Sequence, residues 1–64
     1  MRLSKRKIEI AIADSLMKIT EFSKKANLNF ATVKKVLNGK EIKPETAGKI
    51  AKALNVSVEE LMEE

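Results

Sequence analysis

The chain has 64 residues, with 13 Lys or Arg against 9 Asp or Glu, a formal net charge of +4, and no cysteine or histidine. The lack of those two residue types excludes disulfides, thiol nucleophiles and the common zinc ligand sets, so we expect no enzymatic activity, no metal and no cofactor. The longest apolar run, Ile10 to Ala13, is far shorter than the ~20 residues of a membrane-spanning helix, and the charged start is unlike a signal peptide. We therefore expect one cytoplasmic domain, residues 1–64, without a membrane segment or a small-molecule ligand.

Residues 1–7 form a basic N-terminal lead, in which Ser4 is a suitable N-cap for a first helix that runs to about Leu16. A helical wheel places one stripe of small and apolar residues on the inner face: Ile8, Ala11, Ile12, Ser15 and Leu16. A second stripe lies on the opposite side: Ile10, Ala13 and Met17. We expect either the bundle or a partner to cover this second stripe.

Residues 19–38 predict two short helices that meet at a sharp angle. The first spans about Ile19 to Ala26 and ends at Asn27, a residue type that tolerates the left-handed backbone of a tight turn. Asn29 then caps a helix from Phe30 to about Asn38, and Gly39 ends it. Small and apolar residues fall where such a pair shares a core: Phe22, Ser23, Ala26, Leu28, Val33 and Val36. This pattern is typical of a helix-turn-helix.

A basic loop from Lys40 to Lys43 precedes a fourth helix, which begins at Pro44 and ends near Leu54. Gly48 lies in its interior, where glycine costs about 1 kcal/mol relative to alanine, so we expect a close helix contact there. A short fifth helix occupies residues 57–62. Its start is predicted by a capping box, Ser57 with Glu60, and by a hydrophobic staple, Val56 with Leu61. The fold class is all-α, a compact five-helix bundle.

The charge is distributed unevenly along the chain. Residues 1–43 hold eleven basic and four acidic side chains, a net +7, whereas residues 44–64 hold two basic and five acidic side chains, a net −3. Basic charge concentrated around the predicted helix-turn-helix indicates a polyanionic partner. The simpler interpretation is a lysine-rich surface that serves only solubility, and charge alone does not separate the two.

Two segments resemble the Cro/C1-type helix-turn-helix family of phage and bacterial repressors. They are ITEFSKKANLNFATVKKVLNGK at residues 19–40 and GKIAKALNVSVEEL at residues 48–61, and the resemblance extends over about residues 8–62. It implies a lambda repressor-like DNA-binding domain with the helix-turn-helix at the second and third helices. It also implies that the third helix enters the major groove of double-stranded DNA, commonly in a two-fold homodimer on a palindromic operator.

The resemblance also implies roles for individual positions. The base-contacting positions correspond to Phe30, Ala31, Thr32, Lys34 and Lys35. The phosphate-contacting positions correspond to Lys18, Ile19, Asn29, Asn38, Lys40 and Lys43. The family often has Gln at the start of the second helix, where this chain has Ile19, and the third helix here lacks both Gln and Arg on its outer face. We therefore expect a large phosphate contribution and modest base discrimination.

Several residues keep two interpretations. Phe30 either contacts thymine methyl groups or covers the first helix. The basic residues of the lead either follow DNA phosphates as an arm or are merely solvated: Arg2, Lys5, Arg6 and Lys7. The acidic C-terminal end, which we expect to face away from DNA, comprises Glu59, Glu60, Glu63 and Glu64. Beside it, Val58, Leu61 and Met62 are dimer candidates, with core packing as the alternative and Ile10 with Met17 as a competing surface.

The sequence thus predicts a transcriptional repressor that binds double-stranded DNA in a sequence-specific manner. The alternative is a protein-interaction module on the same fold, such as an antitoxin, an anti-repressor or an inhibitor of a host system. The weak base-contacting face favours the alternative, and the +7 charge around the motif opposes it. Two aromatic residues are too few to favour binding of RNA or single-stranded DNA, which relies on stacking.

Overall fold

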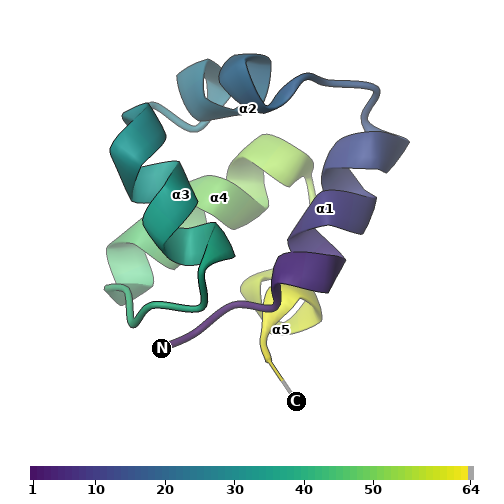
Figure 1. The fold of residues 1–64 in the computed structure, drawn as a ribbon. Coiled ribbons are helices and arrows are strands. Elements are labelled where there is room, and N and C mark those ends of the chain that lie inside the picture. Colours follow the sequence, from purple (N-terminus) through teal and green to yellow (C-terminus); the bar gives the residue numbers. More distant parts are fainter. Residues whose placement is uncertain (64) are drawn as a thin grey trace.

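The computed structural model describes residues 1–63 and contains five α-helices in that range. They are α1 (Lys5–Asp14), α2 (Ile19–Lys25), α3 (Phe30–Leu37), α4 (Pro44–Leu54) and α5 (Val58–Leu61). Figure 1 shows α3 on the left and α1 on the right, with α4 running behind them. Contacts join α4 to α2 and α5, and α1 to α3 and α5. The prediction of an all-α five-helix bundle is confirmed. Glu64, one of the acidic residues predicted at the C-terminal end, lies outside the described residues.

The helix starts depend on local hydrogen bonds that were predicted correctly. The Ser4 hydroxyl accepts from the Lys7 backbone N–H at 3.2 Å, the Asn29 side chain from Thr32 at 2.8 Å, and the Ser57 hydroxyl from Glu60 at 3.3 Å. Pro44 occupies the first turn of α4, where no backbone donor is required. Each such side-chain cap is worth about 1 kcal/mol, a useful contribution in a domain this small.

The ends of α1 to α4 share one backbone arrangement. Each has a residue with a left-handed φ after its last turn: Leu16 (+56°), Asn27 (+58°), Gly39 (+74°) and Asn55 (+58°). In each case the residue after the left-handed one donates its backbone N–H to the carbonyl five residues before it. Examples are the bonds from Leu28 to the Ser23 carbonyl at 2.9 Å and from Val56 to the Ala51 carbonyl at 3.0 Å. These are Schellman motifs, which satisfy carbonyls at the helix end. Met17, Leu28 and Val56 each follow a left-handed residue and pack against the core.

Leu16 corrects the predicted end of the first helix. The helix stops at Asp14 instead of continuing to Leu16, and the Met17 N–H turns back to the Ile12 carbonyl at 3.4 Å. Leu16 was expected on the inner stripe but is 92% exposed, because the left-handed turn directs it away from the bundle. Of the second stripe, Met17 packs against the core, whereas Ile10 and Ala13 remain exposed.

The core lies between α1, α3 and α4, with α2 and α5 closing its ends. Its largest fully buried side chains are Phe22, Leu3, Ile8, Ile50, Leu61, Val33 and Val36. The predicted inner residues of the helix-turn-helix are confirmed, since Phe22, Ala26, Val33 and Val36 are buried and Leu28 packs against them. Ser23 is also buried and donates its hydroxyl to the Thr20 carbonyl at 2.8 Å, so its polar atom is satisfied.

The close contact predicted at Gly48 was wrong. A Cβ built on this residue meets no atom within 4 Å, although Ala47 beside it is fully buried. The inner face of α4 is formed by Ala47, Ile50, Ala51 and Leu54, and Gly48 lies beside that face. Glycine is therefore not required here by packing.

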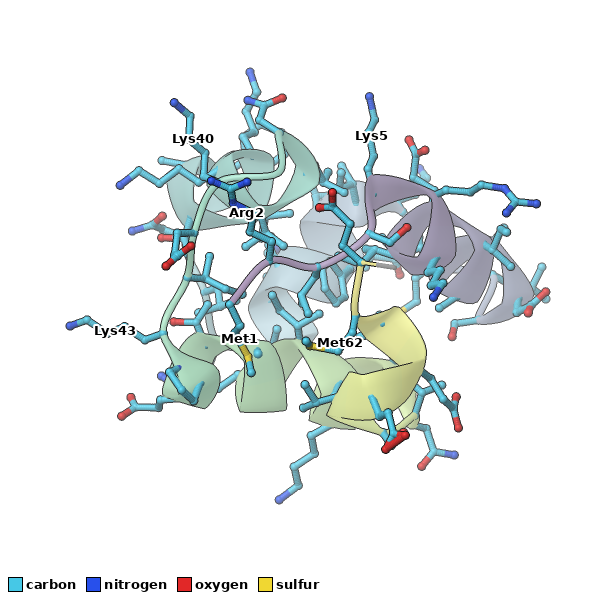
Figure 2. All side chains as sticks on the ribbon, turned by 90° about the horizontal axis from the view of Figure 1, so that it is seen from below. Met1, Arg2, Lys5, Lys40, Lys43 and Met62 are labelled. Carbon is cyan, nitrogen blue, oxygen red and sulfur yellow. The ribbon has the colours of Figure 1, made fainter. Side chains whose placement is uncertain are left out.

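The first four residues form an N-terminal strap across one end of the bundle (Figure 2). The Ile42 N–H donates to the Met1 carbonyl at 2.8 Å, and the Ser4 N–H donates to the Leu61 carbonyl at 2.8 Å. Leu3 forms an antiparallel bridge with Met62 and is only 1% exposed. The strap thus joins the loop after α3 to the C-terminal end. Its buried leucine was not predicted, because the contact of Leu3 with Met62 joins residues far apart in the chain.

Candidate nucleic-acid interface

The inner face of α3 packs firmly on the core, which leaves the outer face exposed. Val33 and Val36 are 1% and 2% exposed, and Asn29 caps the first turn. The predicted base-contacting residues Phe30, Ala31, Lys34 and Lys35 are all exposed, together with Asn38 at the end of the helix, whereas Thr32 is half-buried. The structure therefore brings the predicted set together on one helix, whose orientation is set by the core.

Phe30 and Lys34 form a pair on this face. The Lys34 Nζ lies 5.7 Å from the centroid of the Phe30 ring, one turn away along α3. An exposed cation–π contact of this kind is worth about 0.5–1 kcal/mol and restricts the long lysine side chain. Phe30 is 46% exposed and shares a shallow pocket with Ile19 and Leu37. One part of the ring thus packs beside α2, and the other part is available to a partner.

Elements other than α3 also carry exposed basic side chains. Lys18, Lys40 and Lys43 are exposed, and Figure 2 shows Lys40 and Lys5 projecting from the same side of the molecule, opposite α5. Lys5 belongs to the first turn of α1 and lines the same pocket as Lys34 and Asn38. It is held by a helix and is not part of a free arm. Arg2 is exposed and lies 3.8 Å from the Glu41 carboxylate.

Glu21 at the start of α2 was not singled out as a site residue. Its carboxylate accepts the Lys18 backbone N–H at 2.9 Å, so a negative charge stands at the N-terminal end of this helix. Ile19, expected to contribute only its backbone to phosphate, is half-buried. A Glu three residues after the N-cap is a recognisable sequence signal for such a bond. This charge opposes the predicted phosphate contacts of Lys18 and Ile19.

The dimer candidates at the C-terminal end lie in different environments. Leu61 is 2% exposed and belongs to the core, so its packing interpretation holds and it is not a surface contact. Val58 and Met62 are half-buried, and Met62 is paired with Leu3. Met17, from the competing surface, also packs against the core. Glu59 and Glu60 are exposed on α5, which Figure 2 places opposite Lys5 and Lys40.

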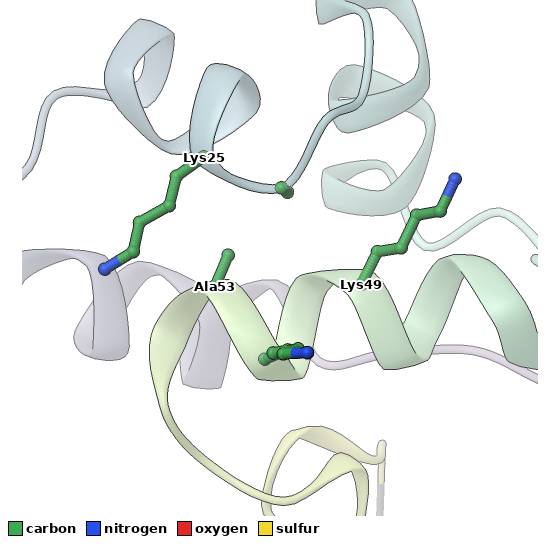
Figure 3. Close-up of a pocket in the computed structure, with 5 residues that line it drawn as sticks. Lys25, Lys49 and Ala53 are labelled. Atoms are coloured by element: carbon green, nitrogen blue, oxygen red, sulfur yellow. The ribbon is translucent and has the colours of Figure 1, made fainter.

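A second basic region lies away from α3. A groove of about 310 Å³ between α2 and α4 is lined by Lys25, Ala26, Lys49, Lys52 and Ala53. Figure 3 shows Ala53 pointing toward α2, with the Lys25 and Lys49 side chains diverging on either side. Lys49 lies 3.8 Å from the Glu45 carboxylate on the same helix. The described residues contain no group of side chains suited to hold a metal ion, and none of their helices is long and apolar enough to cross a membrane.

These features define the class of protein. α2 and α3, joined through the left-handed Asn27 and packed on a common core, form a helix-turn-helix with an exposed basic second helix. Residues 7–63 match the Cro/C1-type HTH DNA-binding domain, and the chain belongs to this family. No curated protein and no solved structure matches the chain significantly. Domains of this family bind DNA and are not enzymes, so both of those predictions are confirmed.

Proposed function

We propose that the protein is a transcription regulator, a repressor, that binds double-stranded DNA specifically with α3 in the major groove. The observation that carries the proposal is the exposed outer face of α3, held by buried Val33 and Val36 and carrying Lys34 and Lys35. A helix fits the major groove, where the edges of all four base pairs differ. Binding over a promoter would exclude other proteins from it, which requires neither a cofactor nor a second activity.

The residues divide into two roles in this proposal. Phe30 and Ala31 contact thymine methyl groups, while Thr32, Lys34 and Lys35 make hydrogen bonds to base edges. Phosphates are bound by residues around this face: Lys18, Ile19, Asn29, Asn38, Lys40 and Lys43. The phosphate contacts supply most of the affinity, because lysine is a less directional donor to bases than arginine. A homodimer on a palindromic site, acting in the cytoplasm, would double the number of base contacts.

Selection from a random DNA library across a salt series tests the proposal. We expect enrichment of a short palindromic sequence and a steep fall in affinity with salt. Lys34→Ala and Lys35→Ala should weaken binding and relax the enriched sequence at the contacted positions. Lys40→Ala should instead reduce the salt slope by about 1 without changing the sequence.

Lys52→Ala is the matched control for these variants, because it removes the same charge from α4 in the groove away from α3. It should leave the enriched sequence unchanged. Absence of DNA binding at ~50 mM salt, where nonspecific phosphate binding is strong, would overturn the proposal.

The alternative is that this face binds a protein, as in an antitoxin, an anti-repressor or an inhibitor of a host system. It is favoured by Phe30, an aromatic side chain 46% exposed on a helix that lacks Arg and Gln on its outer face. In that case Phe30→Ala would abolish partner binding, and removal of charge at Lys40 and Lys43 would have little effect.

A further inference from the structure

The groove between α2 and α4 combines positive charge with an apolar floor. It has a volume of about 310 Å³ and is lined by Lys25, Ala26, Lys49, Lys52 and Ala53. Ala26 and Ala53 are only 3% and 5% exposed, whereas the three lysines are exposed. Figure 3 shows Lys25 and Lys49 on either side of Ala53, with their ammonium groups directed apart. Three positive charges thus surround two small apolar side chains.

The positive charge of this groove does not follow from a uniformly lysine-rich surface. Residues 44–64 carry five acidic side chains and two basic ones, and both of the basic ones, Lys49 and Lys52, line the groove. Lys25 joins them from the last turn of α2. Of the described residues that line the groove, none is acidic. Positive charge gathered at one place in an otherwise acidic part of the chain indicates an anionic partner.

The three ammonium groups are available to such a partner. Within residues 1–63, Lys25 and Lys52 form no ion pair, and Lys49 lies 3.8 Å from the Glu45 carboxylate. The two side chains of that pair are 42% and 82% exposed. Exposed pairs contribute little to stability, because water screens them and two long side chains must be held in one geometry. A carboxylate of a partner can therefore replace Glu45 readily.

The apolar floor favours a protein segment over a nucleic acid as the occupant. Phosphates are commonly bound by backbone N–H groups at helix N-termini, whereas this groove lies at the C-terminal end of α2 and inside α4. An acidic peptide offers carboxylates to the lysines and methyl groups to the floor. The volume is near the lower limit of the ~300–1,000 Å³ typical of ligand sites, which suits a few residues. We propose that the groove binds a short acidic segment of a partner protein, with a small apolar side chain on Ala26 and Ala53.

The location of the groove keeps this contact separate from the outer face of α3. Of the described residues that line the groove, none belongs to α3. A short segment bound there does not cover Lys34 or Lys35, so the protein can hold DNA and a protein segment at the same time. The contact goes beyond the proposed function and does not rest on it.

Fluorescence anisotropy of a labelled peptide that alternates glutamate and alanine tests the groove in the full chain. We expect saturable binding with a Kd between ~10 µM and ~1 mM at ~50 mM salt. Lys25→Glu and Lys49→Glu should each weaken this binding about tenfold or more through like-charge repulsion. Lys24→Glu is the matched control, because Lys24 is also exposed on α2 but does not line the groove, and its effect should be much smaller. Circular dichroism of each variant establishes that it is folded.

A second peptide, with serine in place of alanine, tests the apolar floor. It keeps every carboxylate but replaces the methyl groups by polar groups of similar size, so it should bind several-fold more weakly. Equal affinity for the two peptides would overturn the proposal, and so would equal effects of Lys24→Glu and Lys25→Glu. Either result would mean that the peptide responds only to the overall positive charge. Absence of peptide binding at ~1 mM would also overturn it.

Two further measurements distinguish other occupants of the groove. Lys25→Ala should lower the affinity for DNA no more than Lys24→Ala does, and a larger loss would make the groove a phosphate site and overturn the proposal. Self-association that Lys25→Glu weakens in sedimentation equilibrium would make a second copy the occupant, with the same consequence. DNA binding without peptide binding counts against this groove alone, whereas peptide binding without DNA binding counts against the proposed function alone.

Discussion

Gly39 and Gly48 show opposite requirements for glycine. Gly39 has a backbone φ of +74° at the end of α3, a conformation that residues with a Cβ rarely adopt. Gly48 lies inside α4 with ordinary helical geometry, and a Cβ there would meet nothing within 4 Å. The first glycine is needed by the backbone, and the second lowers the intrinsic stability of its helix.

Gly48→Ala should therefore raise the free energy of unfolding by about 1 kcal/mol, the difference in helix propensity between the two residues. Gly39→Ala should lower it by about 1–2 kcal/mol, the cost of a left-handed backbone with a Cβ. Urea denaturation measures both changes, and the two variants serve as controls for each other since each adds one methyl group. A loss of stability in Gly48→Ala would reveal a packing requirement at that position.

The start of α2 combines a stabilising local bond with a charge unfavourable for phosphate. The Glu21 carboxylate accepts a hydrogen bond from the Lys18 N–H at 2.9 Å, and its negative charge interacts favourably with the positive end of the helix dipole. A DNA phosphate at this end would meet the same carboxylate. The bond thus stabilises the helix start, whereas the charge of Glu21 would weaken a phosphate contact there.

Glu21→Gln tests whether the charge of Glu21 lowers the affinity for DNA. Glutamine retains an acceptor for Lys18 but removes the charge, so DNA affinity should increase several-fold at ~50 mM salt and the gain should shrink as salt rises. Helix stability should fall by less than about 1 kcal/mol. Fluorescence anisotropy with labelled duplex measures the affinity. Glu59→Gln makes the same charge change on α5 and should have a smaller effect, and equal effects for the two variants would contradict a local role for Glu21.

Single elements were predictable where short-range interactions determine them. Ser4, Asn29 and Ser57 cap helices through bonds to residues three positions later, so the helix starts follow from adjacent sequence. The end of α1 was not predictable, because Leu16 has no intrinsic preference for a left-handed backbone. The left-handed turn at Leu16 is determined by the packing of Met17 against the core, and no pattern in the neighbouring sequence predicts it.

For the whole molecule, the N-terminal strap contributes more than its length suggests. Leu3 is 1% exposed and belongs to the same core as Ile8 and Leu61. A domain of this size has a total stability of only about 3–10 kcal/mol. One buried leucine in the strap therefore accounts for a substantial share of it.

Leu3→Ala should lower the free energy of unfolding by about 2–5 kcal/mol, through lost apolar burial and the cavity left behind. The thermal midpoint should fall accordingly in circular dichroism melts. Arg2→Ala is the neighbouring control, because its ion pair with Glu41 is exposed and spans 3.8 Å, and such pairs contribute less than about 1 kcal/mol. If Leu3→Ala melted like the wild type, the strap would not be part of the cooperative core.

The arrangement of the candidate interface was predictable in part. The exposed set on α3 follows from helical periodicity, because the positions of Val33 and Val36 leave Lys34 and Lys35 outward. The place of Lys5 beside Lys34 depends on how α1 crosses α3, and the burial of Leu3 depends on residues near position 62. Such long-range contacts are absent from the local pattern, so the sequence did not reveal them.

The bridge between Leu3 and Met62 also bears on the order of folding. The helices bring together residues close in the chain, whereas this bridge joins residues from opposite ends of the described sequence. Contacts with large sequence separation carry the loop-closure entropy and limit the folding rate. The same strap bonds to Ile42 in the basic loop after α3. We therefore expect this basic loop to reach its final conformation only when the ends of the chain meet, which makes it the last part of the candidate interface to form.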